Sequence, residues 1–250
     1  MSVRRGWTRV LVTIGLLAAP SRAAWAQAPA AAPPPPPGVE ASLEAAIVAT
    51  SGNTSTRTAG LSGDLTMRPG KWVYLAKASY VQNEVSGVVS ARTTQASLRG
   101  ARGISKHASL FAQVGYLRDR FSGIDSRSTV DIGAEAKWSG ARQSFGVDGS
   151  FGYAKEVRLV GAELSTALVG TALHYKLKMS KTSDLSDDLK YSQSLSSRND
   201  YRLEHVIALT AKLSTRFSLK FSNTIRYVNA PVTGFKTTDT ITSTALVAKF

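Results

Sequence analysis

Apolar and polar residues alternate along much of the chain after residue 43. In the clearest run, from Arg216 to Val228, every second residue except Asn223 is apolar or aromatic and the residues between are polar or charged up to Arg226. The apolar set is Phe217, Leu219, Phe221, Ile225 and Tyr227, and the polar set is Ser218, Lys220, Ser222, Thr224 and Arg226. Less regular alternation recurs at residues 203–213 and 74–80. A period of two places successive side chains on opposite faces of a β-strand, so the pattern predicts strands and gives no support to long helices.

Clusters of Gly, Pro, Asn, Asp and Ser divide this region into twelve strands, with ends placed to within about 2 to 4 residues. The predicted strands are residues 43–51, 55–68, 71–84, 90–104, 107–121, 126–138, 142–155, 163–178, 183–195, 200–213, 216–229 and 236–250. Thr, Val, Ser, Tyr and Ala are abundant in them, and beyond residue 42 proline occurs only at Pro69 and Pro231, both in predicted turns.

The lengths of these segments predict a membrane location. After the N-terminal segment no stretch reaches the roughly 18 apolar residues that a transmembrane helix needs, whereas the predicted strands are near the ~9 to 11 residues of a membrane-crossing strand plus a connection. The even-numbered connections are short and several odd-numbered ones are longer, as in outer-membrane barrels with short periplasmic turns and longer outer loops. We therefore predict an all-β fold, an up-and-down antiparallel transmembrane β-barrel of about 12 strands.

Aromatic residues near the strand ends agree with this location. Trp72 and Trp138 both lie beside even-numbered connections, where an interfacial aromatic girdle is expected, although a soluble barrel also places Trp at its rim. The chain ends with Leu246, Ala248 and Phe250 on one predicted face. Such an ending resembles the recognition signal of the outer-membrane assembly machinery, with Ala248 smaller than the residue usual at that place. The alternative is a last strand that simply ends on Phe.

The first residues are typical of a secretory signal peptide. Arg4, Arg5 and Arg9 precede an apolar stretch, and Ala24-Trp25-Ala26 forms a small-x-small cleavage site. We therefore predict a signal peptide over residues 1–26, an Ala/Pro-rich linker over residues 27–42, and a barrel domain over residues 43–250. The expected location is the outer membrane of a Gram-negative bacterium.

Composition narrows the classes of partner and site. The chain has 31 Lys and Arg against 17 Asp and Glu, a net charge of +14, and no cysteine, which excludes structural disulfides, thiolate metal sites and a lipidated N-terminal Cys. The positive charges are spread out, and an exported protein seldom meets nucleic acid, so we expect no nucleic-acid partner. Three explanations fit the excess of positive charge: contact with anionic lipid headgroups, an interior that favours anions, or charge that serves only solubility.

The parity of residues 216–229 predicts which side chains line the interior. If Phe217, Leu219 and Phe221 meet lipid, then Lys220 and Arg226 point into the lumen. These two residues are our candidate lumen-facing cations. A basic lumen favours anions, and its width depends on how the side chains fill it.

Four segments resemble one known family. They are Thr50-Ser51-Gly52-Asn53-Thr54, Gly70-Lys71-Trp72, Arg118-Asp119-Arg120-Phe121-Ser122-Gly123-Ile124-Asp125 and Lys236-Thr237-Thr238-Asp239-Thr240. Together they resemble the YdiY-like family of salt-induced outer-membrane proteins, also called domain of unknown function 481. The resemblance extends over nearly the whole mature domain and implies an outer-membrane β-barrel. It implies no reaction, because the family offers no established catalytic residue or ligand.

Turn chemistry accounts for part of these segments. Ser-Gly-Asn-Thr supplies the positive backbone angles that a tight hairpin needs, and Ser122-Gly123-Ile124-Asp125 fits a turn as well. Arg118, Asp119 and Arg120 place opposite charges at the mouth of an expected outer loop. There they could pair, bind lipid headgroups or contribute nothing measurable.

The sequence contains no recognisable catalytic or cofactor motif. His107, His174 and His205 each stand alone in a strand-like context, without a second ligand at metal-site spacing, and no nucleotide-binding loop or nucleophile elbow is present. We expect no cofactor and no metal. The residues that a barrel hydrolase would draw on are Asp119, Asp125, His174 and Asp200, although strand ends and turns explain them equally well.

These observations lead to three hypotheses. The first is a monomeric outer-membrane barrel that is not an enzyme, with a structural or envelope-stress role or a narrow pore with a basic lumen. Its expected partners are outer-membrane lipids and the assembly machinery. The second is an outer-membrane lipid hydrolase or acyltransferase, and the third is a soluble periplasmic barrel that binds an apolar ligand.

Overall fold

The computed structural model describes residues 38–50, 56–120 and 122–250, so the predicted signal peptide and most of the predicted linker lie outside the described residues. Its strands are β1 (Val39–Thr50), β2 (Thr56–Met67), β3 (Trp72–Val85), β4 (Val88–Gly103), β5 (Ala108–Asp119), β6 (Ile124–Ser139), β7 (Gln143–Arg158), β8 (Leu164–Lys178), β9 (Ser183–Ser194), β10 (Tyr201–Lys212), β11 (Phe217–Val228) and β12 (Thr238–Lys249). In this part of the chain there is no helix long and apolar enough to cross a membrane.

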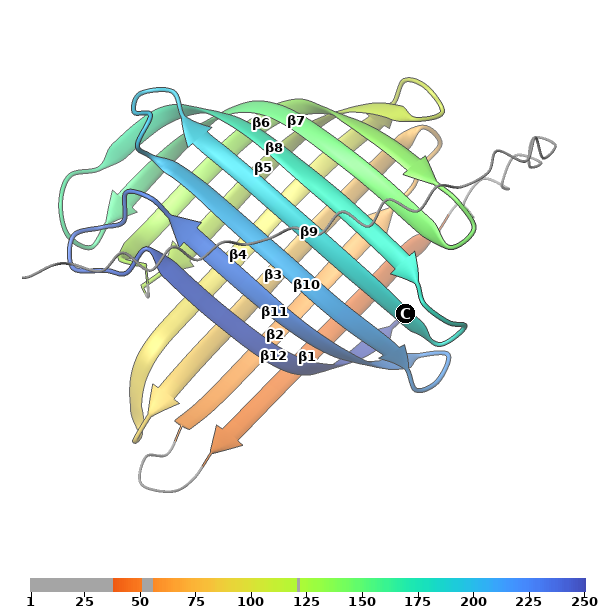
Figure 1. Cartoon of the computed structure of the whole chain (residues 1–250), viewed down its shortest axis with the longest axis horizontal. Helices are drawn as coiled ribbons and strands as arrows, with labels where there is room; N and C mark the ends of the chain where they lie inside the picture. Colours follow the sequence, from red (N-terminus) through yellow and green to blue (C-terminus); the bar gives the residue numbers. More distant parts are fainter. Residues whose placement is uncertain (1–37, 51–55, 121) are drawn as a thin grey trace, which may run out of the picture. The chain divides into compact units, whose positions relative to one another are not determined.

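The strands close into a barrel (Figure 1). Each strand pairs antiparallel with its neighbours in sequence, and β1 pairs with β12. The tilted strands wrap around one interior, which we call the lumen. The prediction of an all-β, up-and-down antiparallel barrel with twelve strands is therefore confirmed.

Two strands extend three or more residues beyond their predicted ends. β1 begins at Val39, four residues before the predicted start of the domain, because this segment pairs with the end of β2. Ala41 also exchanges two backbone hydrogen bonds with Phe250, of 3.2 and 2.9 Å. β7 continues to Arg158, three residues beyond its predicted end, because its charged residues face a polar lumen and do not mark a loop.

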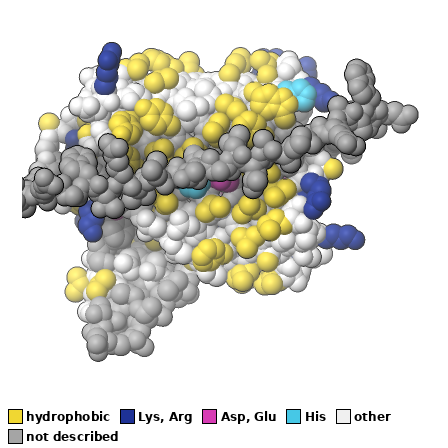
Figure 2. All heavy atoms as spheres, viewed as in Figure 1, with side chains coloured by type: hydrophobic (Ala, Val, Ile, Leu, Met, Phe, Trp, Pro, Cys, Tyr) yellow, Lys and Arg dark blue, Asp and Glu magenta, His cyan; other side chains and the backbone are white. Residues whose placement is uncertain are grey.

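The barrel exposes its apolar side chains and buries many of its charged ones. Val130, Ile132 and Phe151 on the outer wall are 58%, 61% and 55% exposed, whereas Glu156 and Asp148 inside are 1% and 6% exposed. Apolar side chains spread over the visible wall, with Lys and Arg mainly toward its two ends (Figure 2). A water-soluble protein distributes these residue types in the opposite way, so this wall matches a hydrocarbon environment.

Two features interrupt the uniform wall. His205 Nε2 lies 2.7 Å from Asp187 Oδ1, and the pairing of β9 with β10 places both residues among wall-facing leucines and isoleucine. The seam of the barrel is also short, because β1 and β12 pair over only four residues, from Ser42 to Ala45 on β1.

The two ends of the barrel differ in their connections. Five short turns, at residues 68–71, 104–107, 140–142, 179–182 and 213–216, lie at the end that also holds the start of β1 and the end of β12. We call this end the short-turn rim. The opposite end carries the longer loops at residues 159–163, 195–200 and 229–237 together with the two-residue turn Ser86-Gly87, and we call it the long-loop mouth.

Candidate functional site

The lumen contains the two cations that the sequence places there, each beside a carboxylate. Lys220 Nζ lies 2.8 Å from Glu44 Oε1, two strands away on β1. Arg226 Nε lies 3.0 Å from Glu204 Oε2 on the adjacent β10. The positive charge at these positions is therefore compensated, and the lumen here is an ion-pair network where the sequence suggested a basic surface.

A buried glutamate is the centre of the most crowded part of this network. Glu156 Oε2 accepts hydrogen bonds from Arg127 Nη1 on β6 and Arg202 Nη2 on β10, both at 2.6 Å, and its Oε1 accepts one from Arg158 Nε at 2.7 Å. Charge-assisted bonds of this length are strong, and removing one partner from a buried set leaves an uncompensated charge. Arg202 reaches past β9 and β8 to Glu156 on β7, so the cluster ties strands three places apart in the wall together.

A second cluster lies around Arg99 on β4. Its guanidinium donates to Asp148 at 2.8 Å and to Glu135 at 2.9 Å, and it lies 3.6 Å from the ring centre of Phe111. His174 extends the cluster, with Nε2 3.6 Å from Asp148 and Nδ1 2.6 Å from Asp188 Oδ1. Both imidazole nitrogens therefore face carboxylates.

Arg226 also spans the lumen. Its Nη1 lies 3.4 Å from Asp119 Oδ2 on β5, and its Nη2 lies 3.4 Å from the Gln95 side-chain oxygen on β4. β5 is six places from β11 in either direction around the twelve-strand barrel, so the two residues come from directly opposite strands. Asp119 is 3% exposed. The contact closes part of the cross-section of the lumen near the long-loop mouth.

The turn after β5 and the loop before β12 meet above this contact. Ser122 Oγ donates to Asp239 Oδ2 at 3.1 Å. Gly123 has a φ of +74°, and a Cβ atom at this position would lie 2.7 Å from the Phe235 ring and 2.8 Å from Val232. Val232 is 3% exposed, so the loop at residues 229–237 folds inward against the opposite side of the mouth.

The segment Arg118 to Asp125, which carries the clearest family resemblance, divides between lumen and surface. Arg118 Nη2 lies 3.0 Å and Arg120 Nη2 3.8 Å from Asp125 Oδ1, and all three side chains are more than one-third exposed. Asp119, Ser122 and Gly123 make the contacts across the mouth, and Ile124 is buried. Phe121 lies outside the described residues.

The residues considered for hydrolase chemistry lie in separate surroundings. Asp119 contacts Arg226, Asp125 contacts the two exposed arginines, His174 lies between two aspartates, and Asp200 is buried in the connection between β9 and β10. His107 Nδ1 lies 3.0 Å from the Lys137 carbonyl oxygen in a short turn. Among the described residues no group of His, Cys, Asp and Glu has a metal-binding arrangement.

The interfacial aromatics lie at the short-turn rim. Trp72 and Trp138 are 41% and 47% exposed, and their rings stack on Tyr74 and Phe145 respectively. At the C-terminus Leu246 and Phe250 are exposed on the wall side, and Ala248 between them is partly covered.

Sequence reasoning missed the acidic half of the lumen. It named Lys220 and Arg226 but not their partners Glu44 and Glu204, nor the cluster around Glu156. The parity rule that assigned the two cations would have assigned these acids to the same face of their own strands. Which acid meets which cation depends on the register across strands, which the sequence alone does not provide.

Comparison with solved structures gives distant similarities. The NanC porin shares 7% sequence identity, with 85% of this chain and 98% of that chain covered and a TM-score of 0.49. The translocator domain of the autotransporter NalP from Neisseria meningitidis shares 13%, with 85% and 87% covered and a TM-score of 0.48. OmpT, an outer membrane protein of Vibrio cholerae, shares 7%, with 85% and 96% covered and a TM-score of 0.42.

Comparison of sequences identifies the family. No curated protein matches the chain. The family described as "Protein of unknown function, DUF481" matches residues 43–250, which include nearly the whole barrel. The chain therefore belongs to the DUF481 family, as the four sequence segments predicted.

Proposed function

We propose that this protein is an outer-membrane β-barrel that forms a narrow pore for small hydrophilic solutes, closed at its long-loop mouth. The apolar outer wall and the charged lumen support a membrane location, because a lipid-facing barrel needs an apolar exterior and tolerates a polar interior. The twelve strands close into one barrel through the seam of β1 with β12, so no second copy is needed to close the sheet, which supports a monomer.

The observation that carries this proposal is the contact of Arg226 with Asp119 across the lumen. Because it joins opposite strands, this contact narrows the path of a solute at this level of the lumen. The packing of Phe235 and Val232 against Gly123 places a second barrier above the first. Opening therefore requires movement of a loop and one side chain, and the strands can stay in place.

The contacts favour this role over the two alternatives. A hydrolase triad needs one imidazole nitrogen free to accept a proton from a nucleophile, whereas both nitrogens of His174 face aspartates. A soluble barrel for an apolar ligand needs an apolar lumen and a polar wall, and the described residues have the reverse distribution. We therefore propose a role without catalysis.

Planar-bilayer recordings test the proposal. The unmodified protein should give small or infrequent conductance steps, and Arg226→Ser should give larger ones because it removes the side chain that crosses the lumen. Lys220→Ser is the matched control, since Lys220 is also a lumenal cation but contacts only nearby β1, and it should leave the conductance unchanged. If neither the unmodified protein nor Arg226→Ser carries current although both are correctly folded, the pore is refuted and a purely structural role takes its place.

A further inference from the structure

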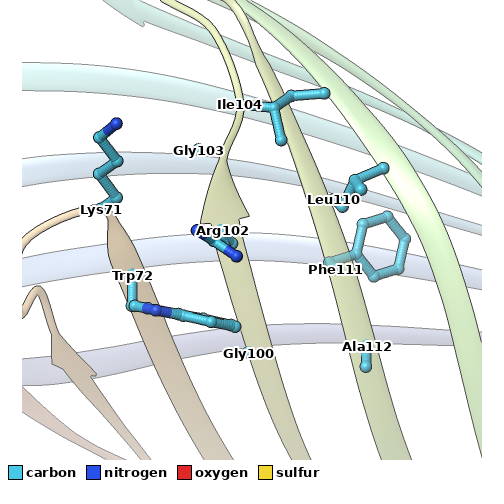
Figure 3. Close-up of a pocket in the computed structure, with 9 residues that line it drawn as sticks. All are labelled: Lys71, Trp72, Gly100, Arg102, Gly103, Ile104, Leu110, Phe111 and Ala112. Carbon is cyan, nitrogen blue, oxygen red and sulfur yellow. The ribbon is translucent and has the colours of Figure 1, made fainter.

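An open groove of about 490 Å³ lies at the short-turn rim on β3, β4 and β5 (Figure 3). Its main lining residues are Lys71, Trp72, Gly100, Arg102, Leu110 and Ala112. The groove belongs to the outer wall, since Trp72, Leu110 and Arg102 are exposed while neighbouring Phe111 is buried on the lumenal face.

The register of the strands explains the hollow. Trp72, Arg102 and Leu110 are direct partners across β3, β4 and β5, and they form the row of side chains at the rim. In the next row Gly100 has no side chain and its partner Ala112 has only a methyl group. The third member of this row is Tyr74, whose ring lies 3.5 Å from the place of a Gly100 Cβ, so the hollow opens on the Ala112 side of Gly100. In Figure 3 the Trp72 ring extends toward Gly100 and lies beneath the Arg102 side chain.

The groove has an amphipathic lining. Its floor is the apolar surface of Gly100, Leu110 and Ala112, and its rim carries the cations Lys71 and Arg102 with no acidic residue among the lining residues. The Arg102 guanidinium carbon lies 5.7 Å from the Trp72 ring centre, a cation–π distance that orients this charge over the groove.

The charge of the whole rim agrees with that of the groove. The five short turns contain six basic residues and no acidic one: Arg68, Lys71, Lys106, Arg142, Lys181 and Arg216. The connections at the long-loop mouth differ, because they contain the acidic residues Glu163 and Asp200 as well as basic residues. Arg68 is paired with Glu40 of β1 at 2.9 Å, and the other five make the short-turn rim the end of the barrel that complements an anionic surface.

We propose that the groove binds one anionic glycerophospholipid, with its phosphate between Lys71 and Arg102 and an acyl chain along Gly100 and Ala112. The inference rests on the membrane location in the proposed function, because the Trp72 level then coincides with the headgroup region. A cation near a charged headgroup favours an anionic over a zwitterionic lipid by about fivefold.

Quenching of Trp72 by brominated lipids tests this site. The chain has four tryptophans, so replacing Trp7, Trp25 and Trp138 with Phe leaves Trp72 as the only reporter. The protein is reconstituted in phosphatidylcholine vesicles that contain increasing fractions of brominated phosphatidylglycerol. Trp72 should show a binding constant for phosphatidylglycerol at least about fivefold above that for phosphatidylcholine. Arg102→Gln should lower this ratio about fivefold, and Lys71→Gln combined with Arg102→Gln should bring it near one.

Two controls separate the possible outcomes. Lys181→Gln removes a cation from a distant short turn and should leave the Trp72 ratio unchanged, and Arg102→Gln should not alter the ratio reported by Trp138 when Trp72 is the residue replaced. Equal quenching by both lipids in the unmodified protein would overturn the groove as a specific site while leaving the barrel in the membrane. No quenching by either lipid would overturn the membrane location itself.

Discussion

The Ser122 hydroxyl donates a hydrogen bond of 3.1 Å to the Asp239 carboxylate, although the two residues are 117 positions apart in the sequence. Ser122 lies in the turn that follows β5, and Asp239 is the second residue of β12, on the opposite side of the barrel. Both residues belong to segments that resemble the family at the sequence level. The two segments therefore meet in one place, at the closed long-loop mouth.

Gly123→Ala is expected to loosen this mouth. The new Cβ would collide with Phe235 and Val232, and the positive φ adds a backbone cost, so local destabilisation of about 1 to 3 kcal/mol is expected. The loop at residues 229–237 should move outward while the barrel stays folded. Planar-bilayer recordings should therefore show larger or more frequent conductance steps than the unmodified protein.

Gly161→Ala is the control for this prediction. Gly161 also has a positive φ, of +96°, but nothing lies within 4 Å of a Cβ added there. It carries the backbone cost without the collision, so its conductance should match that of the unmodified protein. An increase of the same size in both variants would assign the effect to backbone strain and would contradict closure by the loop.

Glu156→Gln is expected to destabilise the barrel strongly. The carboxylate is 1% exposed and accepts bonds from three arginines, so its neutralisation leaves buried positive charge without compensation. A loss of about 3 to 5 kcal/mol in the free energy of unfolding is expected. Urea unfolding in lipid vesicles, followed by tryptophan fluorescence, measures it.

Glu163→Gln provides the matched comparison, since Glu163 and its partner Lys155 are 58% and 60% exposed. An exposed pair contributes about 0 to 1 kcal/mol, so this variant should unfold near the unmodified protein. Similar losses in the two variants would show that burial at Glu156 does not matter.

The ion pair on the wall is expected to be dispensable for stability when it is removed whole. His205→Leu alone leaves Asp187 facing hydrocarbon and should cost about 1 to 2 kcal/mol. Leucine at both positions replaces the pair by apolar surface and should restore or increase the free energy of unfolding. If the double variant is less stable than the single one, this part of the wall does not face lipid.

Phe250 is expected to contribute to assembly of the barrel both through its ring and through its backbone. Deleting it removes the two hydrogen bonds with Ala41 at the short seam as well as the exposed ring, so the truncated chain should accumulate unfolded. Phe250→Ala keeps the backbone bonds and removes only the ring. Pulse-labelled assembly in cells, read by heat-modifiable migration, should be slow for Phe250→Ala if the ring is the assembly signal, and normal assembly would refute that signal.

The sequence predicted most of the fold because a membrane barrel follows one local rule. Alternation along residues 216–229 assigns Phe217 to the wall and Lys220 to the lumen without any knowledge of neighbouring strands, and the structure places both there. The observed end of β7 lies three residues beyond the predicted one, within the stated margin, and the same rule explains the difference. Glu156 and Arg158 resemble loop residues by composition, but inside a polar lumen charge does not end a strand.

The closed mouth could not be predicted in this way. The contact of Arg226 with Asp119 depends on the number of strands, their register and the length of side chains on opposite sides. The position of Phe235 against Gly123 depends on how one loop folds inward, and its sequence suggests only a turn. The groove at Trp72 needs Gly100 and Ala112 as partners across two strands, which is again a matter of register.

The most direct test of this account is a scan of spin labels along β11, which is simple because the chain has no cysteine. Labels are attached one at a time to cysteines at positions 217, 219, 221 and 225 and at positions 218, 220, 222 and 226, in protein reconstituted in lipid vesicles. The first set should collide with membrane-dissolved oxygen, and the second set should be shielded from it and respond more to a water-soluble nickel chelate. Equal exposure of both sets to the nickel chelate, or the reverse phase, would contradict a wall that faces hydrocarbon around a polar lumen.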